Sequence, residues 1–118
     1  MELFNLLDIK GNPTGVTSAK GTQLNNVQYY FGTHTYIYNL SLKFLIQQRA
    51  YSKTFLPGGW NVHLEHIIAG ETSVDCVCRG MQEEVGLLLD SVNISYPNKF
   101  IRHEYIHIVD VYFIQTKL

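Results

Sequence analysis

The stretch that decides the fold runs from Glu65 to Leu87 and reads EHIIAGETSVDCVCRGMQEEVGL. From Thr72 onward apolar side chains recur every three or four residues, which is typical of a helix. Thr72 and Asp75 can form a capping box at the start of this helix, and Gly86 is a natural C-terminal cap. The pattern therefore predicts a helix over residues 72–85, with an apolar face made of Val74, Val77, Cys78, Met81 and Val85.

Two neighbouring carboxylates stand near the end of the predicted helix. On a helical wheel of about 100° per residue, Glu83 falls at about −60° and Glu84 at about +40° relative to Gly80, at the edge of the apolar face. Such a pair is more often a solvated rim than a site. Here, however, Glu71 precedes the helix and Arg79 lies within it. Hard oxygen ligands on one rigid element suit Mg²⁺ or Mn²⁺, so the pattern favours a site for a divalent cation.

This stretch resembles the signature of the Nudix hydrolases, G-x5-E-x7-R-E-U-x-E-E-x-G-U, in which U is a bulky aliphatic residue. Two positions depart from it: Glu65 stands at the first glycine, and Gly80 stands at the glutamate after the arginine. In the family that glutamate is a principal metal ligand and often activates water. A glycine inside a helix costs about 1 kcal/mol relative to alanine, so helix stability gives no reason for Gly80. The matching positions are Glu71, Arg79, Met81, Glu83, Glu84, Gly86 and Leu87.

A second run of sequence narrows the resemblance to one branch of the family. Residues 47–60 contain QQRA, Lys53 and PGGW, and they are similar to the Q-x-R-A-x-x-K and P-G-x-W pattern of the branch related to isopentenyl diphosphate isomerase. In that branch the arginine and the lysine lie over the diphosphate, and the matching residues here are Arg49 and Lys53. The alternative interpretation is a surface arginine and lysine on a loop.

The resemblance implies a fold. The fold class is α/β, a Nudix-type α/β/α sandwich with a mixed sheet. The usual C-terminal helix is absent from it, because the chain stops directly after a predicted strand. The expected organisation is a single domain over residues 1–118, shortened at its C-terminus, with residues 1–32 as an N-terminal strand and loop extension.

The resemblance also implies an activity. The reaction is hydrolysis of a phosphoanhydride bond in a nucleoside diphosphate derivative or another organic diphosphate, with Mg²⁺ or Mn²⁺ as cofactor. Glu83, Glu84 and Glu71 would hold the cation, and catalysis would depend on Glu84, Glu83 and Arg79. Arg79 is expected to hold a helix carboxylate in place by ion pairing. Gly80 is expected to weaken metal binding and to lower the rate.

Two alternatives remain open. A catalytically degenerate module that binds a diphosphate or nucleotide without cleaving it would explain Gly80. An isoprenoid diphosphate isomerase would explain residues 47–60, but the family's isomerases need a reactive cysteine where this chain has Leu64. Cys76 and Cys78 lie within the predicted helix instead. We interpret them as reduced core residues rather than a metal pair, because no second pair of ligands stands nearby.

Composition and charge limit the function classes. The chain has 118 residues, of which 46% are hydrophobic, and a formal charge of −1. This usage is typical of one globular domain, and the near-neutral charge does not favour nucleic acid or an anionic membrane as a partner. No apolar run approaches the roughly 18 residues of a membrane span, so the cytoplasm is the expected compartment. A small-molecule diphosphate is the expected partner, and an uncovered sheet would favour a homodimer.

Apolar and aromatic runs predict five strands in the rest of the chain. They cover residues 34–40, 42–48, 63–69, 87–95 and 105–116, and the first two are expected to form a tight antiparallel pair. The glycines and the proline before residue 32 predict an N-terminal strand or hairpin followed by a loop. Residues 51–60 contain PGG and are predicted to be a loop.

Overall fold

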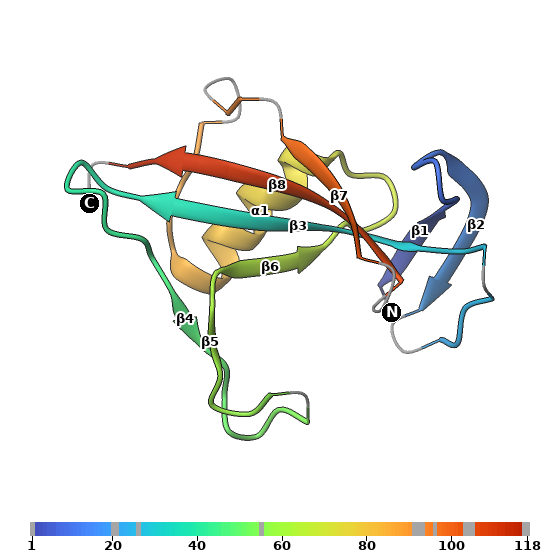
Figure 1. The fold of residues 1–118 in the computed structure, drawn as a ribbon, viewed down its shortest axis with the longest axis horizontal. Helices are drawn as coiled ribbons and strands as arrows, with labels where there is room; N and C mark the ends of the chain where they lie inside the picture. The colour runs from blue at the N-terminus through green and yellow to red at the C-terminus, as the bar shows by residue number, and fades with distance from the viewer. Residues whose placement is uncertain are drawn as a thin grey trace.

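The computed structural model describes residues 2–19, 22–25, 27–54, 56–90, 94–95, 97–102 and 106–116. Its centre is a four-stranded sheet in the order β6-β3-β8-β7 (Figure 1). The strands are β3 (Tyr30–Tyr38), β6 (His63–His66), β7 (Asn98–Arg102) and β8 (His107–Gln115). β3 and β8 run parallel, whereas β6 and β7 pair antiparallel with them at the two edges. The predicted mixed sheet is confirmed.

One helix, α1 (Ser73–Val85), lies across one face of this sheet (Figure 1). Its N-cap is Thr72, whose hydroxyl accepts a hydrogen bond from the backbone N–H of Asp75, while the Asp75 carboxylate accepts one from the N–H of Thr72. It ends at Gly86, whose φ of 72° is the left-handed conformation that glycine adopts without strain. The predicted helix and both of its caps are confirmed. Among the described residues, no helix has the length and apolar character needed to cross a membrane.

The main core lies between α1 and the sheet. Ile37 from β3 and Tyr112 from β8 pack against Val77 and Met81 from α1, and each of these side chains is at most 2% exposed. Val74, Val77, Met81 and Val85 of the predicted apolar face therefore meet the sheet, whereas Cys78 is only half-buried and lies outside this core. Cys76 is also fully buried, and both cysteines are free thiols. Half-buried side chains that complete this core are Leu45, Val74, Val85, Leu87, Leu89, Ile94 and Ile114.

The predicted strand over residues 42–48 is wrong for most of its length. Only β4 (Gln47–Gln48) is a strand, and one isolated bridge between Tyr38 and Phe44 remains of the expected antiparallel pair. Leu42 has a φ of 58°, which interrupts an extended run, and the Asn39 carboxamide accepts two backbone hydrogen bonds that close the turn. The apolar composition of this segment does not indicate a buried strand, because the segment passes the end of the sheet with most of its apolar side chains exposed.

The predicted strand over residues 87–95 is also wrong in its described part. Residues 87–90 and 94–95 follow an irregular path, and residues 91–93 lie outside the described residues. Leu87 and Leu89 pack against the core without pairing with a strand. Sequence reasoning missed the edge strand β7, whereas the predictions over 34–40, 63–69 and 105–116 correspond to β3, β6 and β8. Tyr105 lies outside the described residues.

Two smaller hairpins flank the central sheet. β1 (Leu3–Leu7) and β2 (Pro13–Ala19) form the predicted N-terminal hairpin, which isolated bridges from Phe4 to Ile68 and from Leu7 to Tyr29 join to the rest of the fold. β4 pairs with β5 (Trp60–Asn61) at the base of an arm formed by residues 47–61. Figure 1 shows this arm extending away from the sheet.

Candidate active site

The acidic side chains near α1 divide into two groups, of which the first surrounds Arg79. The guanidinium donates from Nε to Glu71 Oε2 at 3.0 Å and from Nη2 to Glu71 Oε1 at 2.8 Å. It also donates from Nη1 to Glu83 Oε2 at 3.3 Å and from Nη2 to the backbone carbonyl of His66 at 3.2 Å. Arg79 thus ties the loop before the helix to the helix itself. The expectation that it pairs with a helix carboxylate is confirmed by Glu83.

Glu71 is held on both of its oxygens. Besides the two bonds from Arg79, its Oε1 accepts a hydrogen bond from the backbone N–H of Ile68 at 2.9 Å. Burial would raise the pKa of Glu71, but the hydrogen bonds from Arg79 and from Ile68 outweigh it and hold the pKa below its ordinary value. A carboxylate engaged in this way fixes local geometry, because both of its oxygens already accept hydrogen bonds.

The second group lies where β6 faces α1 and consists of His63, Glu65 and Glu84. One possible ligand atom from each of the three lies within 4.8 Å of the other two. His63 Nδ1 is 3.6 Å from Glu84 Oε2, and His63 Nε2 is 4.0 Å from Glu65 Oε2. The strand brings His63 and Glu65 to the same side because alternate residues of a strand share a face. The three side chains together offer two carboxylates and an imidazole to one small space.

Gly80 makes this arrangement possible. A Cβ atom placed on Gly80 would lie 2.6 Å from His63 Nε2 and 3.1 Å from Glu65 Oε2. The first distance is shorter than any that side-chain carbons adopt, so a side chain at position 80 would displace His63. Helix propensity gives no reason for a glycine here, whereas the approach of β6 to the helix does.

Burial sets the charge of the second group. It raises the pKa of Glu65 to about 7, against the opposing effect of Arg79, and the nearby Glu84 and Glu83 raise it further. Burial also lowers the pKa of His63, although Glu84 partly offsets this effect. Arg79, whose Nη1 is 3.9 Å from Glu65 Oε1, offsets the negative charge of this group only in part. Such a place suits a cation.

The structure separates the residues that the sequence assigned to one metal site. Glu84 lies in the second group, whereas Glu71 and Glu83 lie around Arg79. Arg49 and Lys53 lie on the arm formed by residues 47–61, where Arg49 is half-buried and Lys53 is exposed. The base of the arm reaches the second group, because Gln47 Oε1 lies 3.2 Å from His63 Nδ1.

Sequence reasoning missed His63 and Glu65 as site residues. Glu65 was visible only as a departure from the signature, and His63 lies outside both the signature and the run over residues 47–60. The signal that could have found them is the alternation along the strand, which puts both on the face that meets the helix.

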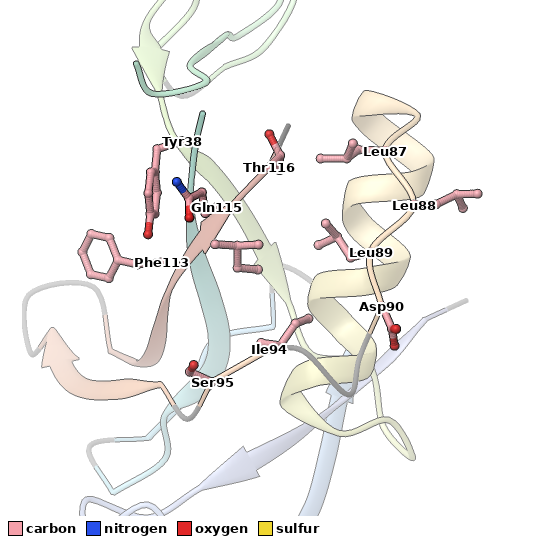
Figure 2. A pocket seen from close by; sticks show the side chains of 11 residues that line it. Tyr38, Leu87, Leu88, Leu89, Asp90, Ile94, Ser95, Phe113, Gln115 and Thr116 are labelled. Atoms are coloured by element: carbon pink, nitrogen blue, oxygen red, sulfur yellow. The ribbon is translucent and has the colours of Figure 1, made fainter. Parts of the chain in front are cut away.

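A cleft of about 640 Å³ lies away from both groups, beside residues 87–90 and 94–95 (Figure 2). Figure 2 shows Leu87 and Leu89 pointing toward it and Leu88 pointing away. Tyr38 and Phe113 line its opposite side. None of the described residues that line this cleft belongs to either acidic group, so the cleft is not the place where the candidate chemistry gathers.

Comparison with curated proteins gives relatives of two kinds, although no family model matches the chain. It is 35% identical over 92 residues to an isopentenyl-diphosphate Δ-isomerase of Corynebacterium glutamicum, which covers 77% of this chain and 49% of the relative. It is 32% identical over 91 residues to an uncharacterised Nudix hydrolase of Listeria monocytogenes, which covers 76% of this chain and 54% of the relative. The chain thus spans about half the length of these relatives.

Comparison with solved structures shows that the chain has the fold of MutT/Nudix family proteins. A Deinococcus radiodurans protein superimposes with a TM-score of 0.81 and 16% identity, over 99% of this chain and 74% of that one. A MutT/Nudix family protein of Enterococcus faecalis gives a TM-score of 0.64 and 19% identity, over 83% and 39%. At these identities the likeness establishes the fold and leaves the activity open.

Proposed function

Because this chain has the Nudix fold and is related in sequence to Nudix hydrolases and isopentenyl-diphosphate isomerases, we propose that it hydrolyses a phosphoanhydride bond with the help of a divalent cation. The substrate class is a nucleoside diphosphate derivative or another organic diphosphate. The observation that supports the proposal best is the position of Glu84, which leaves α1 toward His63 and Glu65 while Arg79 holds the acidic side chains beside it.

The residues of α1 take different roles in this proposal. Mg²⁺ or Mn²⁺, when bound, would neutralise the diphosphate and make a water molecule more acidic. Glu84 is the helix carboxylate that we assign to the cation. Glu83 is 60% exposed and joined to Arg79 by one bond, so it can turn toward the same space. Glu71 remains a candidate ligand from the sequence, but its hydrogen bonds favour a positioning role together with Arg79.

The arm formed by residues 47–61 supplies the positive charge in this proposal. Arg49 and Lys53 are the residues that we expect to contact the diphosphate, since a protein with a formal charge of −1 must meet an anionic ligand with local cations. The contact between Gln47 and His63 links the base of the arm to the acidic group. Substrate binding by the arm is therefore expected to affect the acidic group through the contact between Gln47 and His63.

The proposal is tested by assaying release of phosphate or monophosphate from dinucleotides, nucleotide sugars and isoprenoid diphosphates, with Mg²⁺ and with Mn²⁺. We expect slow turnover that needs the cation, and Glu84→Gln should lower kcat by at least about 10-fold, as loss of a group at a metal site does. The matched control is Glu2→Gln, which removes an exposed carboxylate near the N-terminus. Absence of turnover with every substrate and both cations would contradict hydrolysis.

An isomerase is the second candidate, because one relative at 35% identity carries that name. The residue at the position of the isomerases' reactive cysteine is Leu64. Cys76 cannot replace it, because burial raises the pKa of this thiol to about 12 and a thiolate is the reactive form. We expect no conversion of isopentenyl diphosphate to dimethylallyl diphosphate, and measurable conversion would favour this candidate instead.

A module that binds a diphosphate without cleaving it is the third candidate, and Gly80 is the observation that favours it. Calorimetry with a nucleoside diphosphate and Mg²⁺ separates this candidate from the hydrolase. Binding accompanied by turnover supports hydrolysis, whereas binding without turnover under the same conditions supports the module.

A further inference from the structure

The two positions at which this chain departs from the signature face each other across the interface between β6 and α1. Glu65 stands where the signature has a glycine, and Gly80 stands where it has a glutamate. A Cβ atom on Gly80 would lie 3.1 Å from Glu65 Oε2. We propose that the carboxylate missing from the helix is supplied by Glu65 from the strand, and that Glu65, His63 and Glu84 together bind a divalent cation. This inference deepens the proposed function by naming the ligands of its cation.

His63 is the independent observation that points to a ligand. Its side chain is 2% exposed, and its Nε2 atom has no hydrogen-bond partner among the described residues. Its Nδ1 lies 3.2 Å from Gln47 Oε1, so the neutral ring can donate there and direct the Nε2 lone pair toward Glu65 and Gly80. A buried nitrogen without a partner is costly, and a bound cation would remove that cost. Histidines that bind metals are usually oriented by such a bond on the other nitrogen.

The three side chains lie near one another and would draw closer together around an ion. Ligand atoms at about 2.1 Å from one cation lie at most about 4.2 Å apart. The three atoms offered here lie within 4.8 Å of one another. The three atoms must therefore draw together, and Glu84 is the side chain that can turn toward Nε2, because it is 49% exposed and its Oε2 lies 3.6 Å from the other ring nitrogen, His63 Nδ1.

Arg79 makes its hydrogen bonds to carboxylates outside the proposed set of ligands. It forms hydrogen bonds with Glu71 and Glu83, whereas Glu65 Oε1 lies 3.9 Å from its Nη1. The cation would thus lie beside a carboxylate that Arg79 contacts at 3.9 Å without a hydrogen bond. In this proposal α1 therefore carries both a positioning residue, Arg79, and a ligand of the cation, Glu84.

An imidazole among the ligands changes the expected ion. Mg²⁺ prefers oxygen ligands and retains its water, whereas divalent transition-metal ions accept imidazole, Zn²⁺ readily and Mn²⁺ less readily but more so than Mg²⁺. A site made of His63, Glu65 and Glu84 should therefore bind Mn²⁺ more tightly than Mg²⁺. A site made only of helix carboxylates would not show this difference to the same degree.

The experiment is calorimetric titration of the chain with Mn²⁺ and with Mg²⁺, without substrate. We expect Mn²⁺ to bind more tightly than Mg²⁺, and Glu65→Gln and Glu84→Gln each to weaken Mn²⁺ binding by about 10-fold or more. Glu2→Gln is the matched control and should bind as the unchanged chain does. Thermal melting without metal separates loss of a ligand from loss of folding.

Pulsed electron paramagnetic resonance of the Mn²⁺ complex gives a second readout that a merely structural role would not move. Coupling of the manganese to a ¹⁴N nucleus is expected in the unchanged chain and should disappear in His63→Gln. The inference is overturned if the chain binds no Mn²⁺ at millimolar concentration, if Glu65→Gln binds Mn²⁺ as tightly as the unchanged chain, or if no nitrogen coupling is seen.

The outcome is distinguishable from that of the proposed function. Mn²⁺ binding that depends on Glu65, in a chain that cleaves no diphosphate, would support this inference and contradict hydrolysis. Turnover by a chain whose metal binding is indifferent to Glu65 would support hydrolysis and overturn this inference.

Discussion

The two faces of the central sheet hold histidines in very different ways. Residues directly opposite each other in the strand register share a face, so Thr35, His63 and Tyr112 lie on the side that packs against α1. The register places His34 and His107 on the other side. We call the side that packs against α1 the covered face and the other side the open face. Among the described residues no helix lies over the open face.

On the open face each histidine ring meets another polar ring or a cation. His66 Nε2 lies 3.2 Å from His107 Nε2, and Arg102 Nη1 lies 3.5 Å from His34 Nε2. The neighbouring Phe113 is 55% exposed although it stacks on Tyr36. On the covered face, by contrast, His63 keeps one buried nitrogen without a partner.

The difference teaches that burial, rather than histidine content, distinguishes a candidate ligand from a structural side chain. On the open face the rings of His34 and His107 are half-buried and have partners, so neither calls for a ligand. Where the helix excludes water, a missing partner is costly and calls for an explanation such as a ligand.

The largest expected effect compares the packing of the two faces. Met81→Ala removes a side chain that is fully buried under the helix, so it should lower the free energy of unfolding by about 3 kcal/mol. Phe113→Ala on the open face should cost about 1 kcal/mol, because that ring already contacts water. Urea denaturation measures both values. Equal losses would show that the second face is covered in solution.

A smaller effect is expected from the ion pairs on the covered face. Arg79→Met leaves Glu71 without its two charged donors and should lower the free energy of unfolding by about 2 kcal/mol. Arg79→Lys keeps the charge but loses the planar fork, so it should recover part of this loss and not all of it. Thermal melting of the two variants checks the order. Full recovery with lysine would mean that charge alone matters.

Near neutral pH the smallest effect is expected from the two histidines on the open face, His34 and His107. Burial and Arg102 lower the pKa of His34 to about 4, and burial, with His66 and Arg102, lowers that of His107 to about 4. An ordinary histidine has a pKa of about 6.5, so below that pH the unfolded chain takes up protons first. Stability contributed by these two rings is therefore present at pH 7 and decreases as the pH falls toward 4.

The measurement is the difference in unfolding free energy between the unchanged chain and the variant His34→Gln/His107→Gln, taken at several pH values. Using the difference cancels the carboxylates on the covered face, which titrate in the same range. The unchanged chain should lose more stability on acidification than the variant does. Parallel curves would contradict the lowered pKa values.

Much of the fold could be predicted because it depends on local patterns. The helix, its capping box and its glycine cap follow from spacing and from the conformational freedom of Gly86. The strands with aromatic and β-branched runs were also recognisable. The strand predictions failed at residues 42–48 and 87–90. An apolar run there indicated burial, which was correct only in part, and it does not show whether a partner strand lies beside it.

The candidate site, like the fold, could be predicted only where it depends on local sequence patterns. The family resemblance implied that Arg79 pairs with a helix carboxylate, and the spacing of the acidic residues made Glu84 a candidate ligand. It could not separate Glu71 and Glu83 from Glu84, because a helical wheel says nothing about which side chain Arg79 reaches. That the cation is bound by Glu84 stays a prediction.

The sequence by itself determined that a capped amphipathic helix carries acidic side chains beside an arginine, since such periodicity is written in neighbouring residues. Only the tertiary structure decided that Gly80 faces His63 and Glu65. That contact depends on the register of β6 against β3 and on how closely the helix approaches the sheet. Neither quantity is local, because both are set by packing among segments distant in the chain.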